Sequence, residues 1–432
     1  MLPSAGKPRL LHWIALGLLV ISVCINYADR GNLGVAARSI QTELHFSQEQ
    51  LGILLAAFSF TYALMQLLAG PAIDRWNVNW LYAAGFLIWS AATGLTGVAN
   101  SFAEILTLRL ILGSGESVAY PAYSKIIAAV FPENLRGTAN ALIDAGSKIG
   151  PALGVLFGVK LLNEFTWRGM FIVIAIASGI WLIPWCAVAP MLKTRPANQR
   201  GPTWSPSYRQ LIQTRAFWGT VLGLFGANYA WFFLLNWIPY YFETDRHISG
   251  DRLALFASLP FWGVAISSML LGILADALIR RTHDAGRVRQ AFVCCGLLGS
   301  CVFMIPAALV RQPFLFQFCL VLSLISMGGF SSNHWALTQR LSGVEAAAKW
   351  TGFQNCIGNF AGVIANYLGG LTLSWTHSFV PAFGLAVLAM LAGVLGYWFI
   401  ISRPDPVNWE MHDTPKKSCG ILGTRVLKRR NM

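Results

Sequence analysis

The chain has 432 residues, of which 55% are hydrophobic and only 12% are charged, against about 25% charged residues in ordinary soluble domains. With a mean hydropathy of +0.55, it carries more apolar surface than one soluble core buries, which excludes a soluble protein and indicates a polytopic membrane protein. The net charge of +14 does not indicate nucleic-acid binding, because the charges lie between the apolar segments and in the C-terminal tail.

Twelve apolar segments follow one another along the chain, each long enough to cross a hydrocarbon core of about 30 Å as a helix. The first could pass for a signal peptide, but it continues into Asp29 and Arg30 without a small-residue cleavage site. The sequence therefore predicts an all-α membrane protein with twelve transmembrane helices. The predicted segments are 12–38, 51–73, 79–98, 102–130, 137–161, 167–192, 216–243, 252–276, 288–310, 314–340, 347–373 and 379–402.

The positions of lysine and arginine predict the orientation in the membrane. If the N-terminus lies inside, the inside connections carry most of the basic residues and the outside connections carry few, as the positive-inside rule requires. We therefore expect a multi-pass protein of the cell inner (plasma) membrane with both termini in the cytoplasm. The basic residues assigned to the inside are Arg75, Lys125, Arg136, Lys193, Arg195, Arg200, Arg209, Arg215, Arg280, Arg281, Arg287, Arg289, Arg340, Lys349 and those of the tail from Arg403 onward.

The longest polar connection divides the twelve segments into six and six. It is basic and contains Pro196, Pro202 and Pro206. The predicted parts are an N-terminal six-helix bundle (1–192), a cytoplasmic linker (193–215), a C-terminal six-helix bundle (216–402) and a basic cytoplasmic tail (403–432).

The two halves repeat a short motif at corresponding places. The second segment ends in GPAIDR, with Gly70 four residues before Asp74 and with Arg75 next, and the eighth ends in GILADALIRR, with Gly272 four residues before Asp276. The aspartate can bridge to the next helix and the glycine lets helices approach, so we predict a gating motif here. Transporters built from such repeats keep their substrate site near the bilayer midplane, between the halves.

The fourth segment carries a cation and an anion in apolar surroundings. Arg109 and Glu116 are seven residues apart, so they share one face of a helix at a separation of about 10 Å along its axis. A charge in lipid costs several kcal/mol, so both groups must face the protein interior or a water-filled cavity. They form either a structural ion pair that locks helices together, or a substrate or proton site in a transporter.

The first segment adds Asp29 and Arg30 to this charged set. Arg30 presents a planar fork that can bind a carboxylate with two hydrogen bonds. Burial raises the pKa of a carboxylic acid and a nearby arginine lowers it, so the protonation of Asp29 and Glu116 can switch as Arg109 or a substrate approaches. This mixture of carboxylates and arginines favours an anionic substrate carried with protons. A site for a cationic drug would be expected to contain carboxylates and no arginine.

The fifth segment holds Asp144 and Lys148 four residues apart, a favourable acid-to-base order on a helix. We interpret them as an internal pair that neutralises both charges. The alternative is that Lys148 contacts a second acidic group, for example on a dicarboxylate. We interpret His334 as a hydrogen-bonded helix contact and Asn359 as a bond between helices.

Over essentially its whole length the chain resembles the major facilitator superfamily. The general marks are the motif after the second segment, its partner after the eighth, and Gly146-x₃-Gly150-Pro151-x₂-Gly154. More specifically it resembles the anion:cation symporter branch, which includes bacterial galactonate, glucarate, hexuronate and aromatic-acid transporters and animal lysosomal and vesicular organic-anion carriers. The matching stretches are NYADRGNLGVA (26–36), FSFTYALMQLLAG (58–70), RLILGSGESVAYPA (109–122) and GFQNCIGNFAG (352–362). The loop after Arg75 departs from this branch, because it reads WNVNW without the usual glycine and basic pair.

The resemblance implies a major facilitator fold and a role for each polar group. Arg30 would hold the substrate carboxylate, Asp29 and Glu116 would take up the protons, and Arg109 would bridge to Glu116. Some of the implied substrate contacts are aromatic residues. The alternative for these is that they pack between helices or belong to an aromatic belt at the membrane interface. These contacts are Tyr27, Tyr62, Ser147, Ser332, Trp335 and Asn355.

These observations predict a secondary active transporter that imports an organic anion with protons by alternating access. The expected substrate is a sugar acid such as an aldonate, hexuronate or aldarate. We expect a monomer that uses the proton gradient as its energy source, with no cofactor, metal or nucleic acid. The alternatives are an organic-anion exporter or antiporter, an aromatic-acid transporter, and a membrane-embedded enzyme or sensor. The sequence carries no catalytic triad, nucleotide loop or metal-ligand cluster, so we do not expect an enzyme.

Overall fold

The computed structural model describes residues 10–192 and 206–409, and for residues 74, 133, 134, 137, 344, 345 and 348 it describes the backbone alone. Within this part of the chain every regular element is a helix, as the composition predicts. The elements are α1 (Leu10–Leu44), α2 (Gln48–Arg75), α3 (Val78–Thr96), α4 (Phe102–Glu116), α5 (Ala119–Val130), α6 (Glu133–Val188), a 3₁₀ turn (Ala189–Met191), α7 (Tyr208–Gln213), α8 (Arg215–Thr244), α9 (Gly250–Thr282), α10 (Ala285–Leu309), α11 (Pro313–Thr376), α12 (Val380–Leu395) and a π-helical turn (Gly396–Ile400).

The helices follow the predicted segments with two differences. α6 and α11 each contain two predicted segments, which meet at a residue with positive φ, Thr166 (61°) and Gly343 (66°). The segment 102–130, expected as one helix, is instead divided at Ser117 and Val118 into α4 and α5. Nine stretches of the described residues are long and apolar enough to cross a membrane. The count of twelve crossings and the bounds of the two bundles stay predictions.

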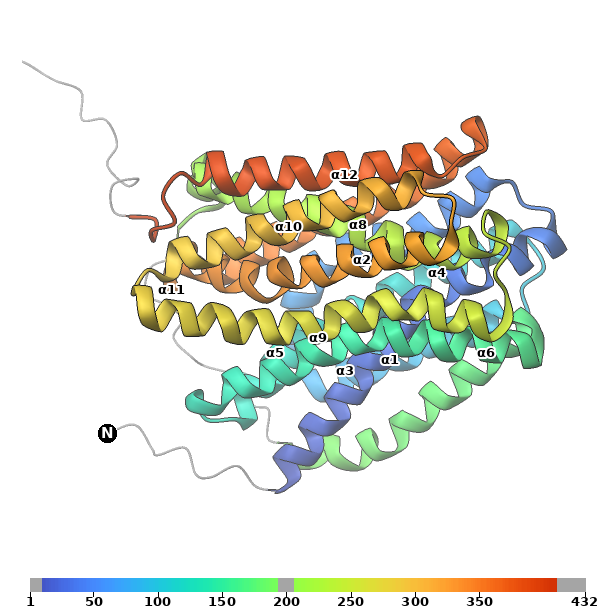
Figure 1. The fold of residues 1–432 in the computed structure, drawn as a ribbon. Helices are drawn as coiled ribbons and strands as arrows, with labels where there is room; N and C mark the ends of the chain where they lie inside the picture. The colour runs from blue at the N-terminus through green and yellow to red at the C-terminus, as the bar shows by residue number, and fades with distance from the viewer. Residues whose placement is uncertain (1–9, 193–205, 410–432) are drawn as a thin grey trace, which may run out of the picture.

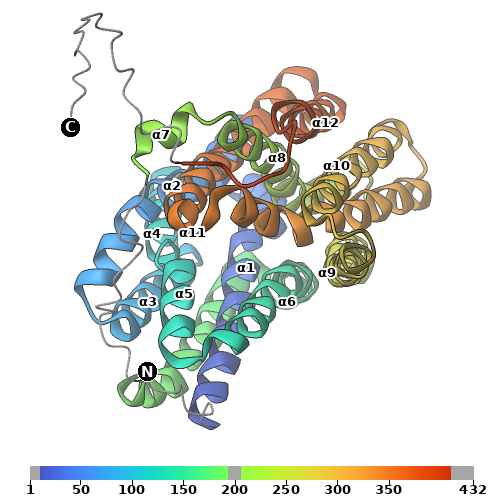
Figure 2. The same cartoon turned by 90° about the vertical axis from the view of Figure 1, so that its left-hand side faces the viewer.

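The long helices run side by side, and the two groups of helices are visible in end view. α1 begins and the described chain finishes at one end of this array, on the left in Figure 1. We call this the termini end; Leu10, Gly343 and Trp409 lie there. The other is the far end, where His45 and Thr166 lie. In Figure 2, which looks onto the termini end, α1 to α6 lie on one side and α8 to α12 on the other, with α2 and α11 adjacent at the middle.

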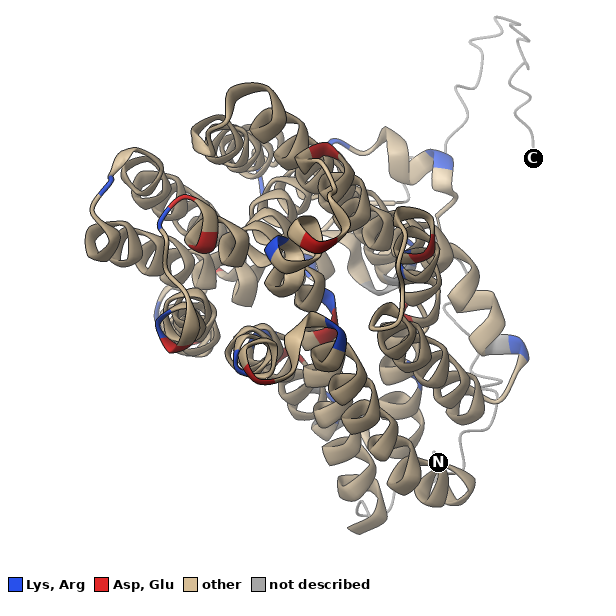
Figure 3. Cartoon of the chain, turned by 90° about the vertical axis from the view of Figure 1, so that its right-hand side faces the viewer, with Lys and Arg blue, Asp and Glu red and all other residues tan. Residues whose placement is uncertain are grey.

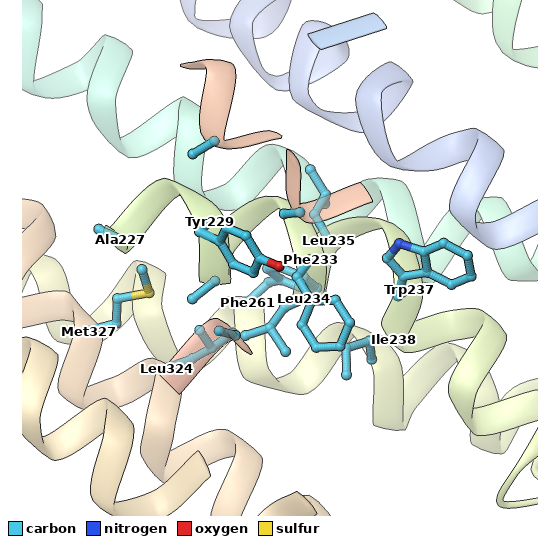
Figure 4. Packing of buried hydrophobic residues seen from close by; sticks show 14 of the residues in the cluster. Ala227, Tyr229, Phe233, Leu234, Leu235, Trp237, Ile238, Phe261, Leu324 and Met327 are labelled. Atoms are coloured by element: carbon cyan, nitrogen blue, oxygen red, sulfur yellow. The ribbon is translucent and has the colours of Figure 1, made fainter. Parts of the chain in front are cut away.

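Packing in the second half is dominated by aromatic side chains of α8. Tyr229, Phe233 and Trp237 are all buried and belong to one apolar cluster with Phe261 of α9 and Leu324 of α11 (Figure 4). Aromatic side chains each bury about 150–250 Å² and therefore dominate such cores. The same buried cluster continues into α1 and α2 of the first half, so the halves are joined by apolar contacts as well as polar ones.

Many charged residues lie at helix ends and connections, as the coloured ribbon in Figure 3 shows in a view onto the far end. Among the described lysine, arginine, aspartate and glutamate residues, four are buried, and all four were singled out from the sequence. They are Asp29, Arg30, Arg109 and Glu116. Because burying an unpaired charge costs several kcal/mol, these four residues mark the part of the fold that needs a functional explanation.

Contacts between the halves close the far end. The Nη1 atom of Arg38 donates to the backbone oxygen of Glu243, and the Tyr240 hydroxyl donates to Gln41 Oε1 at 2.6 Å. Gly34 of α1 lies so close to α8 that a Cβ atom there would meet the backbone oxygen of Asn236 at 2.4 Å. These contacts join α1 to α8 on the far-end side of the molecule.

A larger side chain at Gly34 is expected to force the far end open. Small-to-large substitutions in packed sites cost about 1–3 kcal/mol, which is about tenfold in the population of the closed state for each 1.4 kcal/mol. Gly34→Leu should therefore lower uptake about tenfold and speed alkylation of a single reporter cysteine at Ile40, which is fully buried here. Gly17→Leu on the same helix is the matched control, because a Cβ there meets nothing within 4 Å. Equal uptake and labelling in both variants would show that the contact does not govern closure.

Candidate functional site

A cavity of about 1060 Å³ lies between the two halves. Its walls come from α1, α2, α5 and α6 on one side and from α8, α9 and α11 on the other, with α7 at the termini end. Arg30 and Tyr62 line it near the middle of their helices, whereas Tyr208 and Lys349 line it at the termini end. The cavity therefore runs from the helix midpoints to the termini end, opposite the closed far end.

Arg30 is held flat at the cavity wall by two tyrosine rings. Its guanidinium carbon lies 4.4 Å from the ring centre of Tyr27 and 4.4 Å from that of Tyr62. Tyr27 is three residues before Arg30 and so shares its helix face, while Tyr62 comes from α2. Cations over aromatic faces are attracted by the ring quadrupole, so the two rings help to hold the guanidinium in place.

Behind Arg30, a buried carboxylate completes an ion pair. The Nε atom of Arg30 donates to Glu116 Oε2 at 2.9 Å, and the side chains are 3% and 0% exposed. Arg30 Nη2 and Glu116 Oε1 have no hydrogen-bond partner among the described residues. The pair therefore keeps one donor and one acceptor free, next to a cavity that a ligand can enter.

The structure corrects the expected role of Arg109, because Arg30 and not Arg109 forms the ion pair with Glu116. Within the described residues, Nε and Nη2 of Arg109 have no hydrogen-bond partner. The ring centre of Phe58 lies 5.3 Å from the guanidinium carbon of each arginine. Arg109 is thus stabilised by an aromatic face and by the nearby charges, while Arg30 reaches the carboxylate directly from α1.

Asp29 is the second buried carboxylate of this group. Its Oδ1 atom accepts a hydrogen bond from Asn32 Nδ2 at 3.0 Å, and its Oδ2 atom has no partner among the described residues. Two carboxylates and two arginines therefore share one buried region of α1 and α4. Such a set is neutral while both carboxylates are ionised, and protonation of one carboxylate leaves one excess positive charge, which an anionic ligand can balance.

On the opposite wall, amides of α11 reach across to α2. Asn355 Nδ2 and Asn359 Nδ2 donate to Gln66 Oε1 at 3.1 and 3.4 Å. The predicted interhelical bond of Asn359 is confirmed. Gln66 was missed in the sequence, although it lies four residues after Tyr62 and therefore on the same face of α2. All four side chains line the cavity.

Most of the expected substrate contacts lie at the cavity, and one does not. Ser332 faces α9 instead: its Oγ atom donates to Gly328 O at 3.0 Å, and a Cβ on Gly272 would lie 3.4 Å from Ser332 Cβ. Ser331 lines the cavity in its place, because successive residues point about 100° apart on a helix. The expected contacts that line the cavity are Tyr27, Arg30, Tyr62, Ser147, Trp335 and Asn355, with Asp144 and Lys148 as the accessory pair.

Removing the Ser332 hydroxyl should leave substrate affinity unchanged, since that hydroxyl bonds its own helix. We expect Ser332→Ala to keep a KM within about twofold of the wild type, and Asn355→Ala to raise KM about tenfold, because a lost hydrogen bond costs about 0.5–1.5 kcal/mol and an unsatisfied partner more. The check is the concentration dependence of initial uptake for both variants in the same vesicles. A KM increase in Ser332→Ala that matches Asn355→Ala would place Ser332 back at the site.

Three further polar residues line the cavity, and the sequence predicted none of them as a substrate contact. Tyr120 donates its hydroxyl to the Tyr27 hydroxyl at 3.1 Å, and Asn228 donates to the Gly358 backbone oxygen at 3.0 Å. His334, expected as a helix contact, lies with Nδ1 3.3 Å from the backbone oxygen of Ser331 on its own helix, and it also lines the cavity. Each of these three polar residues lies in an otherwise apolar helix, and this is the feature of the sequence that could have identified them.

The predicted gating motif is only partly described. In the second half, Asp276 forms an ion pair with Arg289 of α10 at 3.0 Å, as expected for an aspartate that bridges to the next helix. In the first half, Gly70 lines the cavity and Arg75 is exposed at the end of α2. The side chain of Asp74 lies outside the described residues.

A helical chain with a charged cavity between two helical groups has the architecture of a secondary transporter. A family model described as Major Facilitator Superfamily matches residues 19–282 and 241–432. The chain belongs to this superfamily. It is accordingly a multi-pass membrane transporter and not an enzyme.

Similar proteins are named as transporters of sugar acids. The chain is 28% identical over 428 residues to a probable L-galactonate transporter of Escherichia coli K12, with 94% of this chain and 93% of that protein covered. It is 27% identical to a D-galactonate transporter of Escherichia coli O6:H1, covering 92% and 97%. It is also 27% identical to a hexuronate transporter of Bacillus subtilis, covering 89% and 94%.

Among solved structures, the chain is similar to a bacterial homologue of the human lysosomal transporter Spinster in an inward-facing, unoccupied conformation. The TM-score is 0.76 at 16% sequence identity, and 91% of this chain and 98% of that chain are covered. At this identity the likeness shows the fold.

Proposed function

We propose that this protein imports an organic anion, most simply a sugar acid, together with protons. The observation that carries the proposal is Arg30, a buried guanidinium at the wall of the cavity, held between two tyrosine rings and paired with a buried glutamate. The names of the similar galactonate and hexuronate transporters support the same substrate class.

Arg30 binds the substrate carboxylate in this proposal. Its Nη2 atom is without a hydrogen-bond partner among the described residues, and a guanidinium fork matches the geometry of a carboxylate. Tyr27 and Tyr62 hold the fork in place, so little side-chain entropy is lost when the anion binds. Hydroxyls of a sugar acid then meet amides on both walls of the cavity, among them Gln66 of α2, Asn228 of α8 and Asn355 of α11.

Competition for Arg30 couples the substrate to the proton. When a substrate carboxylate approaches Arg30, Glu116 and the substrate present two negative charges to one cation, and like charges in a buried site favour protonation of one of them. Glu116 takes up the proton in this scheme, and Asp29, whose Oδ2 atom has no partner among the described residues, is the second protonation site. Arg109 stays beside both carboxylates and limits the cost of their deprotonated state.

The same proposal includes transport by alternating access, and the difference between the two ends of the molecule supports it. In the present state the cavity extends to the termini end while α1 and α8 close the far end. We place both termini in the cytoplasm of a bacterial-type inner or plasma membrane, since the basic connections lie at that end; this state then faces inward. Rocking of the two bundles, bounded as predicted from the sequence, would open the far end of the monomer. The proton gradient supplies the energy, with no cofactor.

An aromatic acid is the second candidate substrate. Trp231, Phe330 and Trp335 all line the cavity, and they offer faces on which a benzoate ring can stack. The amides that line the cavity favour the sugar acid, because they can bond its several hydroxyls and an aromatic ring offers few such groups.

Uptake into proteoliposomes tests the proposal directly. Purified protein is assayed under an inward proton gradient with labelled galactonate, glucuronate, glucarate and 4-hydroxybenzoate in parallel. We expect one sugar acid to accumulate and a protonophore to abolish the accumulation. Exchange of preloaded anion without net uptake would instead identify an antiporter, and accumulation of 4-hydroxybenzoate alone would identify the aromatic-acid transporter.

A further inference from the structure

The cavity has a second cationic group that the carboxylate site at Arg30 does not use. Lys148 of α6 lines the cavity and is 17% exposed. Its Nζ atom lies 3.6 Å from Asp144 Oδ1, longer than the 2.7–2.9 Å of a charge-assisted hydrogen bond. No hydrogen bond from its ammonium group is found within the described residues, so the group keeps its donors for a ligand.

A buried acceptor lines the same cavity. His334 is 5% exposed, and its Nε2 atom has no hydrogen-bond partner among the described residues. Its ring stacks on that of Phe330 at 4.6 Å between centres and lies tilted at 46° against that of Trp335 at 4.4 Å. Because Nδ1 faces the Ser331 backbone oxygen, the neutral ring carries its proton there and Nε2 accepts, so the available partner is a hydroxyl donor.

The two cations stand at different depths along the cavity. α6 packs against α1 so closely that a Cβ on Gly150 would lie 2.8 Å from Tyr27 Cβ. Both helices start at the termini end. Lys148 is two residues before Gly150, and Arg30 is three residues after Tyr27. This offset of five residues corresponds to about 7.5 Å along the helix axes between the two backbone positions, a spacing that the two ends of one dicarboxylate can span.

The charged residues that line the cavity can accommodate a second anionic group on the substrate. The charged residues among the described cavity walls are Arg30, Asp144, Lys148 and Lys349. Lys349 donates to the backbone oxygen of Pro206 at the termini end. Asp144 is 48% exposed, so water screens it and its hold on Lys148 is weak. A dianion that spans Arg30 and Lys148 would balance both inner cations.

We propose that Lys148 and His334 form a second subsite, which takes the distal 2-hydroxycarboxylate end of a dianionic sugar acid, an aldarate. Lys148 binds the second carboxylate, and His334 Nε2 accepts from the adjacent hydroxyl. The inference rests on the proposed function, since Arg30 holds the first carboxylate. An aldonate or a hexuronate has one carboxylate, so Lys148 stays paired with Asp144 when such an acid binds.

The test compares acids that differ in the distal group. Galactarate and galactonate share their hydroxyl pattern, and each competes against a labelled acid for the purified wild type and for Lys148→Met. We expect the wild type to prefer galactarate about tenfold, since each charged contact is worth about 1.5–3 kcal/mol. Lys148→Met should remove that preference with galactonate affinity changed less than about threefold. His334→Phe should weaken both acids, because both carry hydroxyls, and His334→Gln, which keeps an acceptor, should restore part of the loss.

Matched controls separate this proposal from the general one. Lys160→Met changes an exposed lysine of the same helix and should leave both affinities unchanged. Asp144→Asn frees Lys148 and should preserve or strengthen galactarate binding. Equal losses for both acids in Lys148→Met, or a wild type that binds galactonate and not galactarate, would overturn the second subsite while Arg30 keeps its role. Failure of the wild type to bind any acid in a direct binding assay would overturn the proposed function itself.

Discussion

Arg30→Ala is expected to abolish saturable binding of the transported acid. The variant removes the cation that the substrate carboxylate meets, and truncating one partner of a buried charge pair costs about 2–5 kcal/mol, a loss of about thirtyfold or more in affinity. Titration calorimetry on the detergent-purified protein measures this without transport. Arg30→Lys should recover the charge and only part of the affinity, because an ammonium lacks the planar fork.

The fold of this variant needs its own control. Arg30→Ala leaves Glu116 buried without its 2.9 Å partner, and breaking a buried pair in this way costs about 3–5 kcal/mol of stability. A double variant, Arg30→Ala with Glu116→Gln, removes both charges and should regain thermal stability while binding stays lost. If the double variant is stable and binds the acid like the wild type, the assignment of Arg30 is wrong.

Glu116→Gln is expected to separate transport from the proton gradient. The amide keeps the shape of the side chain and an oxygen for Arg30 Nε, but it cannot take up a proton. Accumulation against a gradient should therefore fall to the background level, while exchange of labelled for unlabelled acid continues. Both are measured in the same proteoliposomes, with and without an imposed proton gradient.

The matched control is Glu104→Gln, an exposed glutamate at the start of the same helix α4, which should behave like the wild type. Accumulation by Glu116→Gln at the wild-type level would assign the coupling proton elsewhere, with Asp29→Asn as the next variant to measure. Loss of exchange together with accumulation would show that Glu116 serves binding and not coupling.

The helical architecture could be predicted because hydropathy follows directly from composition. The four buried charges could also be predicted, since a charge within an apolar segment must face the interior. Arg109 and Glu116 do lie on one helix and are both buried. Which arginine pairs with Glu116 could not be predicted: spacing along α4 is a local property, while the approach of Arg30 from α1 depends on how helices pack around Phe58.

In the second half, the sequence did not determine which side of a predicted helix faces the cavity. Segment 314–340 was predicted as a helix, but its rotation about its own axis was not determined by the sequence. A rotation of about 100° exchanges Ser331 for Ser332 at the cavity, and only the contact between Ser332 and Gly272 decides between them. Gln66 was missed for the opposite reason, because its partners Asn355 and Asn359 lie almost 300 residues further along the chain.

Closure of the far end by Gly34 and Asn236 has a pharmacological consequence. In this state a cavity of about 1060 Å³ extends to the termini end. A bulky acid analogue that fills this volume and does not cross membranes would therefore inhibit from that side. With the termini in the cytoplasm, as proposed above, such a compound would block inside-out vesicles and spare intact cells, so inhibitors aimed at this conformation must first be able to enter the cell.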